Sequence, residues 1–314
     1  MYICGPFFTN HHILNELKRD LVIGTRGSRL ALWQSEHTQQ LLKDIGISSG
    51  LQVIKTKGDQ IQHLSFDKIE GKGFFTKEIE DELLEGNVDI AVHSLKDMPT
   101  TQPDGLVLAA LLKRADPADW MIVNKSSMDS DKDLSVKQDP VIGTSSARRK
   151  AQVLGFRPDA QIKDIRGNVP TRLRKLQEGQ FDAILLAAAG LTRLQLDLSE
   201  FHVIKFNPRE FVPAPGQGVV AIQCRIEDIE TRRMLKKLHQ SQVGQCSNVE
   251  RSVLKMMDGG CQLPLGVHCQ KDLNNYYHVF AAFSEAWDSP LKFAQISSST
   301  TDGLAKQVFN ELQI

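Results

Sequence analysis

Short apolar segments alternate with helical segments along most of this 314-residue chain, and that alternation rules out most fold classes at once. The predicted elements of the first stretch are, in order, strand 21–24, helix 30–45, strand 51–55, a helix that starts at Thr76 and ends at Gly86, and strand 89–93. Such a pattern is typical of α/β proteins. We therefore predict an α/β domain that closes near Leu112.

The alternation starts again after residues 113–119, a polar stretch with a proline, as is common in linkers. The predicted elements here are strands 141–142, 162–165 and 181–187, with a helix that Asn168 and Pro170 begin and Gly179 ends. After His239 the pattern becomes a helix around 249–257, strand-like runs near Leu263, His278 and Leu291, and an amphipathic helix with Leu304, Val308 and Leu312. We predict a second α/β domain and a small α+β third domain.

Composition excludes several classes of function. The chain has 38 basic and 38 acidic side chains, so no overall field attracts nucleic acid. No apolar run approaches the roughly 20 residues that cross a membrane. Residues 1–8 are apolar but lack a basic leader, so we expect an appended segment at 1–19 and no signal peptide. The cysteines are odd in number and form no C-x-x-C pair, which favours free thiols in the cytoplasm over disulfides or a metal site: Cys4, Cys224, Cys246, Cys261 and Cys269.

Arginines recur beside glycine and hydroxyl side chains at three predicted strand-to-helix junctions, and in open α/β sheets such junctions line the ligand crevice. A planar guanidinium binds a carboxylate through two parallel hydrogen bonds, and several guanidiniums in one cleft repel one another unless a polyanion lies between them. We predict a small, highly acidic ligand. The candidate residues are Arg26, Ser28, Thr144, Ser145, Ser146, Arg148, Arg149, Arg166, Arg172 and Arg193. Taken singly, each arginine could instead be a solvated surface group.

A second candidate group, Ser94, Lys96 and Asp97, follows the predicted buried strand at 89–93. We expect Asp97 to remain ionised among cationic side chains and to stabilise a cationic intermediate. The alternative is that it caps a turn before Pro99. His93 is expected to be a packed core residue and not a base.

Two loops complete the set of candidates. Residues 69–75 are glycine-rich but lack the spacing of a phosphate-binding loop, so we interpret them as a mobile lid. Cys261 lies in Gly259-Gly260-Cys261-Gln262, where glycines leave the thiol unobstructed and able to carry a covalent group. The alternative is a buried, inert thiol.

Together these motifs resemble the porphobilinogen deaminase family, also called hydroxymethylbilane synthases, over about residues 20 to 312. The resemblance rests on residues 24–28 with 30–34 behind them, Lys68 and Lys72, the His-Ser-x-Lys-Asp motif that ends at Asp97, residues 143–149 and 166–169, Pro215-Gly216-Gln217-Gly218, and the Gly-Gly-Cys-Gln loop. Residues 1–19 lie outside it, and Phe74 and Asp258 are local variations.

The resemblance implies an α/β fold of two periplasmic-binding-protein-like domains around a cleft, plus a small α+β C-terminal domain. The first α/β domain is implied to span residues 20–113 and 217–238. The second is implied to span 118–212, and the C-terminal domain 241–314. It also implies a dipyrromethane cofactor attached to Cys261 through a thioether and Asp97 as the catalytic group. The further binding residues that it implies are Lys68, Lys72, Phe75, Ser94, Lys96, Gln217 and Gly218.

The implied reaction is that of a transferase in tetrapyrrole, haem-type biosynthesis. Four porphobilinogen molecules condense head to tail with release of ammonia, and each unit adds two carboxylates to the growing polypyrrole chain. Hydrolysis then releases the linear product hydroxymethylbilane, and the thioether acts as an anchor only. The resemblance implies a monomeric cytoplasmic enzyme without nucleic-acid or membrane partners.

A rival interpretation is a solute-binding or effector-sensing module, because paired α/β domains around an anion site would give a similar sequence pattern. A nucleic-acid binder is a weaker rival. Only the deaminase interpretation assigns a role to Cys261 and predicts a self-attached chromophore, which intact mass and absorbance would detect.

Overall fold

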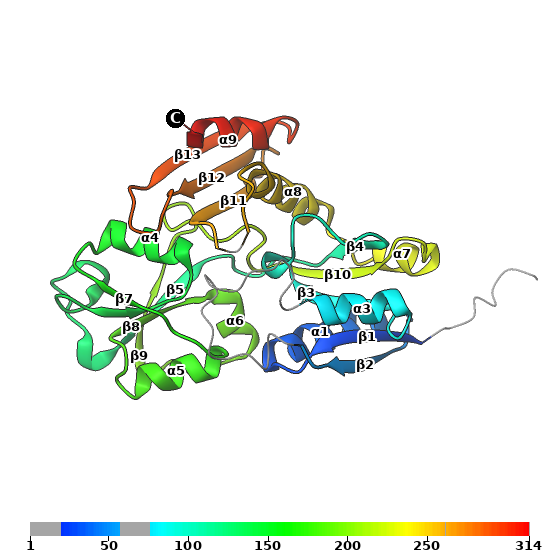
Figure 1. Cartoon of the computed structure of the whole chain (residues 1–314), viewed down its shortest axis with the longest axis horizontal. Coiled ribbons are helices and arrows are strands. Elements are labelled where there is room, and N and C mark those ends of the chain that lie inside the picture. Colours follow the sequence, from blue (N-terminus) through cyan, green and yellow to red (C-terminus); the bar gives the residue numbers. More distant parts are fainter. Residues whose placement is uncertain (1–19, 57–75, 261, 314) are drawn as a thin grey trace, which may run out of the picture.

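The computed structural model describes residues 20–56, 76–260 and 262–313. Within them the chain forms three β-sheets with helices packed against them (Figure 1). The first and second sheets lie along the long axis of the molecule, and the third lies above them in this view. In this described part of the chain, no helix is long and apolar enough to cross a membrane.

The first sheet combines strands from two distant parts of the chain, in the order β2-β1-β3-β10-β4. β1 runs parallel to β2 and β3, whereas β10 runs antiparallel to β3 and β4. Its elements are β1 (Leu21–Arg26), α1 (Arg29–Asp44), β2 (Ser49–Ile54), α3 (Lys77–Glu85), β3 (Ile90–Ser94), β4 (Leu106–Leu111), β10 (Val220–Arg225) and α7 (Ile229–Lys236). Ile23, Ile90 and Ile222 share one core with Leu42 of α1, as expected for central strands covered by helices.

The second sheet repeats this arrangement in the order β7-β6-β8-β5-β9. β6 runs parallel to β7 and β8, and β5 runs antiparallel to β8 and β9. Its elements are β5 (Asp119–Asn124), β6 (Val141–Gly143), α4 (Ala147–Phe156), β7 (Gln161–Lys163), α5 (Val169–Gln177), β8 (Ala183–Ala187), α6 (Ala188–Arg193) and β9 (Phe201–Lys205). In both sheets, therefore, three neighbouring strands run parallel, and the fourth strand, β10 or β5, runs antiparallel to both of its neighbours.

Two segments carry the chain between these sheets: residues 112–118 lead from β4 to β5, and residues 206–219 lead back from β9 to β10. They lie against each other, since the Ala115 amide donates to the Gly218 carbonyl over 3.0 Å. Gly218 has a φ of +85°, and a Cβ there would lie 2.7 Å from the Ala115 carbonyl oxygen. Only glycine fits this close approach between the two crossing segments.

The third sheet is antiparallel throughout, in the order β11-β12-β13. Its elements are α8 (Ser241–Met256), β11 (Leu265–Lys271), β12 (Tyr277–Phe283), β13 (Lys292–Ser298) and α9 (Leu304–Gln313). Val253 of α8 and Val308 of α9 share a core with Val267 and Val279 of the sheet. Phe280 and Ala282 instead pack on Val212, which joins this domain to the crossing segment.

The structure confirms the predicted α/β, α/β, α+β order and the elements that the sequence predicted within the described residues. One difference is α8, which begins at Ser241 and not near Val249. Gly244, Cys246 and Ser247 continue the buried face of that helix, and their small side chains concealed its apolar period. The domain bounds themselves remain a prediction.

Candidate active site

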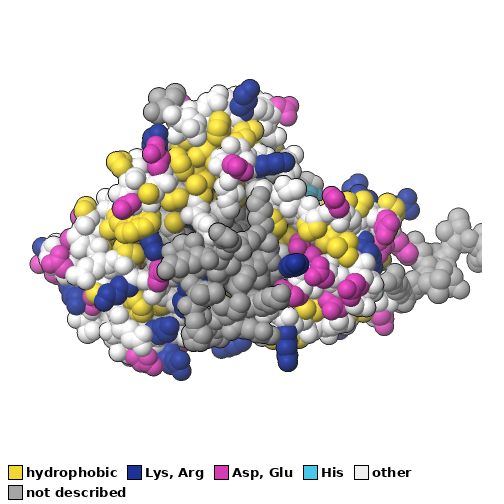
Figure 2. All heavy atoms as spheres, viewed as in Figure 1, with side chains coloured by type: hydrophobic (Ala, Val, Ile, Leu, Met, Phe, Trp, Pro, Cys, Tyr) yellow, Lys and Arg dark blue, Asp and Glu magenta, His cyan; other side chains and the backbone are white. Residues whose placement is uncertain are grey.

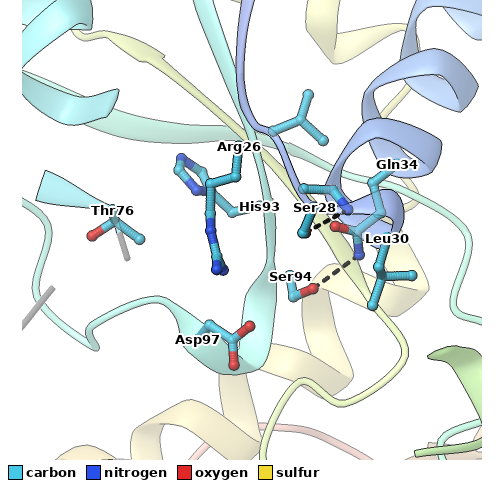
Figure 3. Close-up of a pocket in the computed structure, with 10 residues that line it drawn as sticks. Arg26, Ser28, Leu30, Gln34, Thr76, His93, Ser94 and Asp97 are labelled. Atoms are coloured by element: carbon cyan, nitrogen blue, oxygen red, sulfur yellow. Dashed lines mark hydrogen bonds between the residues drawn. The ribbon is translucent and has the colours of Figure 1, made fainter. Parts of the chain in front are cut away.

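A cavity of about 80 Å³ opens where β1 and β3 end, at the carboxyl ends of parallel strands (Figure 3). Its lining residues are Arg26, Ser28, Leu30, Ala31, Gln34, Thr76, Val92, His93, Ser94 and Asp97. In Figure 3 the Arg26 side chain points from the end of β1 towards Asp97. The cavity thus brings together Arg26, Ser28, Ser94 and Asp97, which the sequence had proposed from separate motifs.

Local hydrogen bonds hold the wall formed by α1. Ser28 caps this helix, and its side chain accepts a hydrogen bond from the Ala31 amide over 3.3 Å. Farther along, the Gln34 side-chain amide donates to Ser94 Oγ over 2.9 Å and ties the helix to the end of β3. The sequence analysis missed Gln34, although its position two turns into a helix at a ligand-binding junction was a usable signal.

His93 lies in the same wall and is buried, which confirms that it is a packed residue. Burial is the main reason that the pKa of His93 is lowered to about 4; a hydrogen bond with Gln223 opposes the shift, and the nearby Arg26 charge adds to it. The imidazole is therefore neutral near pH 7 and adds no charge to the cavity.

Asp97 belongs to a short 3₁₀ turn, Leu95–Asp97, that follows β3. The turn is anchored at Leu95, which is fully buried and whose amide donates to the Val219 carbonyl over 3.0 Å. Asp97 is exposed and faces the cavity (Figure 3). The anchored turn therefore presents a carboxylate at a fixed place beside Arg26.

Lys96, on the same turn, faces the crossing segments. Its Nζ lies 3.3 Å from Gln217 Oε1, while Gln217 Nε2 donates to Asp119 Oδ1 over 2.9 Å and to the Pro117 carbonyl over 2.8 Å. Burial lowers the pKa of Lys96 to about 8, with Asp97 opposing the shift and Arg149 adding to it. Lys96 is therefore a cation that loses its charge far more readily than an ordinary lysine.

The junction between β6 and α4 holds the predicted hydroxyls. Ser145 Oγ donates to the Ile165 carbonyl over 3.0 Å and accepts from the Ile165 amide over 3.1 Å. Thr144 Oγ1 accepts from the Ser146 amide over 3.2 Å. These bonds hold two neighbouring strand-to-helix junctions of the second sheet together.

Arg148 and Arg149, at the same junction, have a protein partner that the sequence analysis did not identify. Arg148 Nη1 lies 2.6 Å from Asp119 Oδ2, and Arg149 Nη2 lies 2.6 Å from Asp119 Oδ1. Burial alone would raise the pKa of Asp119, but the two guanidiniums hold it well below its ordinary value. We had placed Asp119 in a polar linker, whereas it begins the buried strand β5.

A third group of arginines comes from the junction before α5. Asn168 caps this helix by accepting from the Thr171 amide over 3.0 Å, and Arg172 Nε donates to the Gly167 carbonyl over 2.8 Å. Burial and, after it, the charges of Arg149 and Arg166 lower the pKa of Arg172 to about 10. The charges of Arg149 and Arg166 therefore act on the buried Arg172, as expected for a site that receives an anion.

Arg193, from α6, reaches across to the crossing segment 206–219 and to helix α1 of the first domain. Its Nη2 donates to the Gly218 carbonyl over 2.8 Å, and its guanidinium lies 5.4 Å from the centre of the Trp33 ring on α1. Burial lowers the pKa of Arg193 to about 10. Arg193 thus joins the two α/β domains and supplies a further cation at their boundary.

Four predicted site residues, Lys68, Lys72, Phe75 and Cys261, lie outside the described residues, as does the whole predicted lid at 69–75. Cys224, Cys246 and Cys269 are free and buried. The part of the chain that the structure describes contains no cluster of His, Cys, Asp or Glu suited to a metal ion. Acidic and basic side chains are interspersed over the face in Figure 2, so the cationic groups of the site are a local feature.

Comparison with known proteins gives consistent results. The family model described as "Porphobilinogen deaminase, dipyromethane cofactor binding domain" matches residues 21–233, and "Porphobilinogen deaminase, C-terminal domain" matches residues 244–279. A porphobilinogen deaminase of Sulfurimonas denitrificans is 46% identical over 253 residues, covering 80% of this chain and 79% of the relative. One of Brevibacillus brevis is 44% identical over 256 residues, covering 81% of each.

Among solved structures, a periplasmic sulfonate-binding protein of a putative ABC transporter from Methylobacillus flagellatus is similar with a TM-score of 0.41 and 11% identity. The match covers 74% of this chain and 68% of that protein.

Proposed function

The chain belongs to the porphobilinogen deaminase family, and from that premise we propose that Asp97 is its catalytic group and Cys261 its cofactor anchor. The activity of the family is the stepwise condensation of four porphobilinogen molecules, with loss of ammonia, to hydroxymethylbilane. The residues 21–233 match the family's dipyrromethane cofactor-binding domain, so the cofactor is dipyrromethane.

The observation that carries the site assignment is the cavity that Arg26 and Asp97 line, together with the buried Arg172, whose pKa the charges of Arg149 and Arg166 help to lower. Dipyrromethane carries acetate and propionate groups, and carboxylates are the ligands that guanidinium groups bind best. The donor set therefore fits the cofactor: Arg166, Arg172 and Lys96 would hold it, and Arg149, whose nitrogens donate to Asp119 and to the Leu185 carbonyl, would add its charge. When bound, the cofactor supplies a pyrrole chain end to which the substrate units are joined. Charge-assisted hydrogen bonds contribute about 1.5–3 kcal/mol each, so several of them can hold a chain whose charge increases.

Asp97 acts on the reacting substrate unit in this proposal. Loss of ammonia leaves an electron-poor, positively charged pyrrole, and a fixed carboxylate stabilises such a cation. Its oxygens also accept a hydrogen bond from a pyrrole N–H and can take up the proton released there. Arg26, on the opposite wall of the cavity, would bind a substrate carboxylate and so orient the ring against Asp97.

The remaining assignments concern the substrate-binding residues, the cellular location and the oligomeric state. We assign substrate contacts to Ser28, Ser94, Thr144, Ser145, Ser146, Arg148, Arg193, Gln217 and Gly218, and to Lys68, Lys72 and Phe75 outside the described residues. We also propose that the enzyme is a cytoplasmic monomer. The odd number of cysteines supports a reducing compartment.

The cofactor anchor is tested by intact mass spectrometry of purified Cys261→Ser. We expect a folded protein that lacks the dipyrromethane mass and the Ehrlich-reactive chromophore, because serine is a far weaker nucleophile than a thiol. Cys246→Ala, a change at a buried thiol of the same domain, is the matched control and should keep both. Retention of the adduct in Cys261→Ser would refute the anchor.

The role of Asp97 is tested by Asp97→Asn, which keeps the size of the side chain and removes its charge. Turnover is expected to fall by about 100- to 1000-fold, the usual cost of removing one electrostatic stabiliser of a transition state. The cofactor mass should persist, because Asp97 does not hold the cofactor in this proposal. Near-normal turnover would show that the stabilising charge lies elsewhere.

A further inference from the structure

Arg251, on helix α8 of the third domain, contacts the turn that carries Asp97. Its Nη1 donates to the carbonyls of Leu95 and Met98 over 3.3 and 3.1 Å, and its Nη2 donates to the carbonyl of Pro99 over 2.6 Å. The three carbonyls bracket Asp97 on both sides in the sequence. We propose that Arg251 is a positioning residue that fixes Asp97 from another domain, an inference that rests on the proposed role of Asp97.

The chemistry of the turn explains why a guanidinium suits this place. The Met98 amide donates to the Leu95 carbonyl over 3.1 Å and Gln102 Nε2 donates to the Pro99 carbonyl over 2.8 Å, so each of these oxygens has a second lone pair that a further donor can use. The proline at position 99 has no N–H with which to continue a helix. A guanidinium has five donors in one rigid plane, so it can satisfy several carbonyls and also fix their relative orientation. Leu95 is held from the other side by the Val219 carbonyl. Arg251 therefore completes the fixation of the turn.

The helix that carries Arg251 is itself firmly attached to the crossing segments. The neighbouring Glu250 is fully buried, and its carboxylate accepts from Arg114 Nη1 over 2.6 Å, from the Gly216 amide over 2.7 Å and from the Cys269 amide over 2.8 Å. Burial alone would raise the pKa of Glu250, but the Arg114 charge outweighs it and holds the pKa at about 2. The carboxylate is thus ionised and paired at physiological pH, so α8 has a fixed place against the first domain.

The position of α8 shows why the contact between Arg251 and the Asp97 turn matters for the site. Figure 1 places this helix between the third sheet and the first sheet. α8 ends at Met256, shortly before Cys261 in the sequence. The same helix therefore leads to the proposed cofactor anchor and holds the turn of the proposed catalytic carboxylate. Arg251 would fix the position of Asp97 relative to the domain that carries the growing chain.

The first test compares Arg251→Ala with Arg251→Lys, with Arg232→Ala as the control. Arg232 also donates to a backbone carbonyl, that of Ile226 over 2.8 Å, but on the outer helix α7. In Arg251→Ala we expect full cofactor mass, a nearly unchanged KM, and kcat lower by roughly 10- to 100-fold, because misplacing a catalytic group by about 1 Å has that effect. Lysine should restore part of kcat, and added millimolar guanidinium should restore part of it in the alanine variant.

A role in packing alone predicts a different result: a lower melting temperature with no recovery of kcat by lysine or by guanidinium. That result, or wild-type kcat in Arg251→Ala, would overturn the proposal. Arg232→Ala should keep wild-type kcat. If Arg251→Ala does not fold, Arg251→Lys serves as the variant in the next comparison.

A double-mutant cycle separates this proposal from that for Asp97. If Arg251 acts through Asp97, adding Arg251→Lys to Asp97→Asn should lower kcat no further, because the group that it positions has already lost its function. Additive losses in the double variant would refute action through Asp97. Near-normal kcat of Asp97→Asn alone would instead refute the proposed catalytic group, so the two failures are distinguishable.

Discussion

The junction after β1 and the junction after β6 have similar sequences but use their arginines differently. At the first, Arg26 projects into the cavity and points towards Asp97 (Figure 3). At the second, Arg148 and Arg149 are buried and both pair with Asp119. The antiparallel strand of the first sheet, β10, begins with Val220, whereas its counterpart in the second sheet, β5, begins with Asp119. At the second junction, an acidic residue two strands away in the sheet thus binds both arginines, whereas Arg26 of the first junction lines the cavity.

The largest effect that this comparison predicts is on stability, in Asp119→Asn. Removing the carboxylate leaves two buried guanidiniums without their shared charge, which costs about 3–5 kcal/mol in the free energy of unfolding. Denaturant titration at pH 7 measures it, and Asp97→Asn, a change at an exposed carboxylate, should stay within about 0.5 kcal/mol of the parent. A loss below about 1 kcal/mol would mean that water or the backbone solvates these arginines adequately.

The same variant gives a pH dependence of known sign. The pKa of Asp119 is held well below its ordinary value, so its contribution to stability is complete above the unfolded-state pKa of about 3.9 and is lost as pH falls towards the folded-state pKa. The difference in unfolding free energy between parent and Asp119→Asn should therefore shrink on acidification below pH 4. A constant difference between pH 7 and pH 3 would contradict this assignment.

A smaller effect, on binding, is predicted for Arg26→Leu. Losing one charge-assisted hydrogen bond to a substrate carboxylate should weaken binding by about 1.5–3 kcal/mol, so KM for porphobilinogen should rise by roughly 10- to 150-fold. Steady-state kinetics measures KM, and denaturant titration should show little change in unfolding free energy. Arg148→Leu is the matched counterpart and should lose stability by several kcal/mol, because it leaves Asp119 with one fewer partner. Equal losses of stability in both variants would remove the distinction between the two junctions.

The smallest effect concerns Lys96. This residue belongs to the turn that carries Asp97, and it contacts Gln217, which in turn donates to Asp119. Its pKa of about 8 means that it is charged below that pH and neutral above it, so anion binding should weaken as pH rises through 8. We expect kcat/KM to fall by about tenfold between pH 8 and pH 9.5 in the parent and much less in Lys96→Arg, since arginine keeps its charge. A pH profile of kcat/KM for both proteins checks this. If both proteins gave identical profiles, the fall of kcat/KM above pH 8 would be due to another titrating group.

Much of the site could be predicted because the responsible signals are local. Strand and helix periods placed the junctions after residues 24, 142 and 165, close to the ends of β1, β6 and β7, and a junction in an α/β sheet implies a ligand crevice. The motif around Asp97 followed a strand that the apolar run made recognisable. Gln34, Asp119 and Arg251 were missed because each acts through a partner that is distant in sequence: Ser94, Arg148 and the carbonyl of Leu95 lie 60, 29 and 156 residues away.

The sequence by itself determined the order of the elements and the positions of the junctions, because helical and strand periods depend on side chains a few residues apart. Only the tertiary structure decided which charges meet. Asp119, at the start of β5, pairs with Arg148 of α4, 29 residues away in the sequence, whereas Arg26 at the end of β1 lines the cavity. Charge pairing and desolvation depend on distances of a few ångströms in space, and those distances are set by packing between elements far apart in the chain.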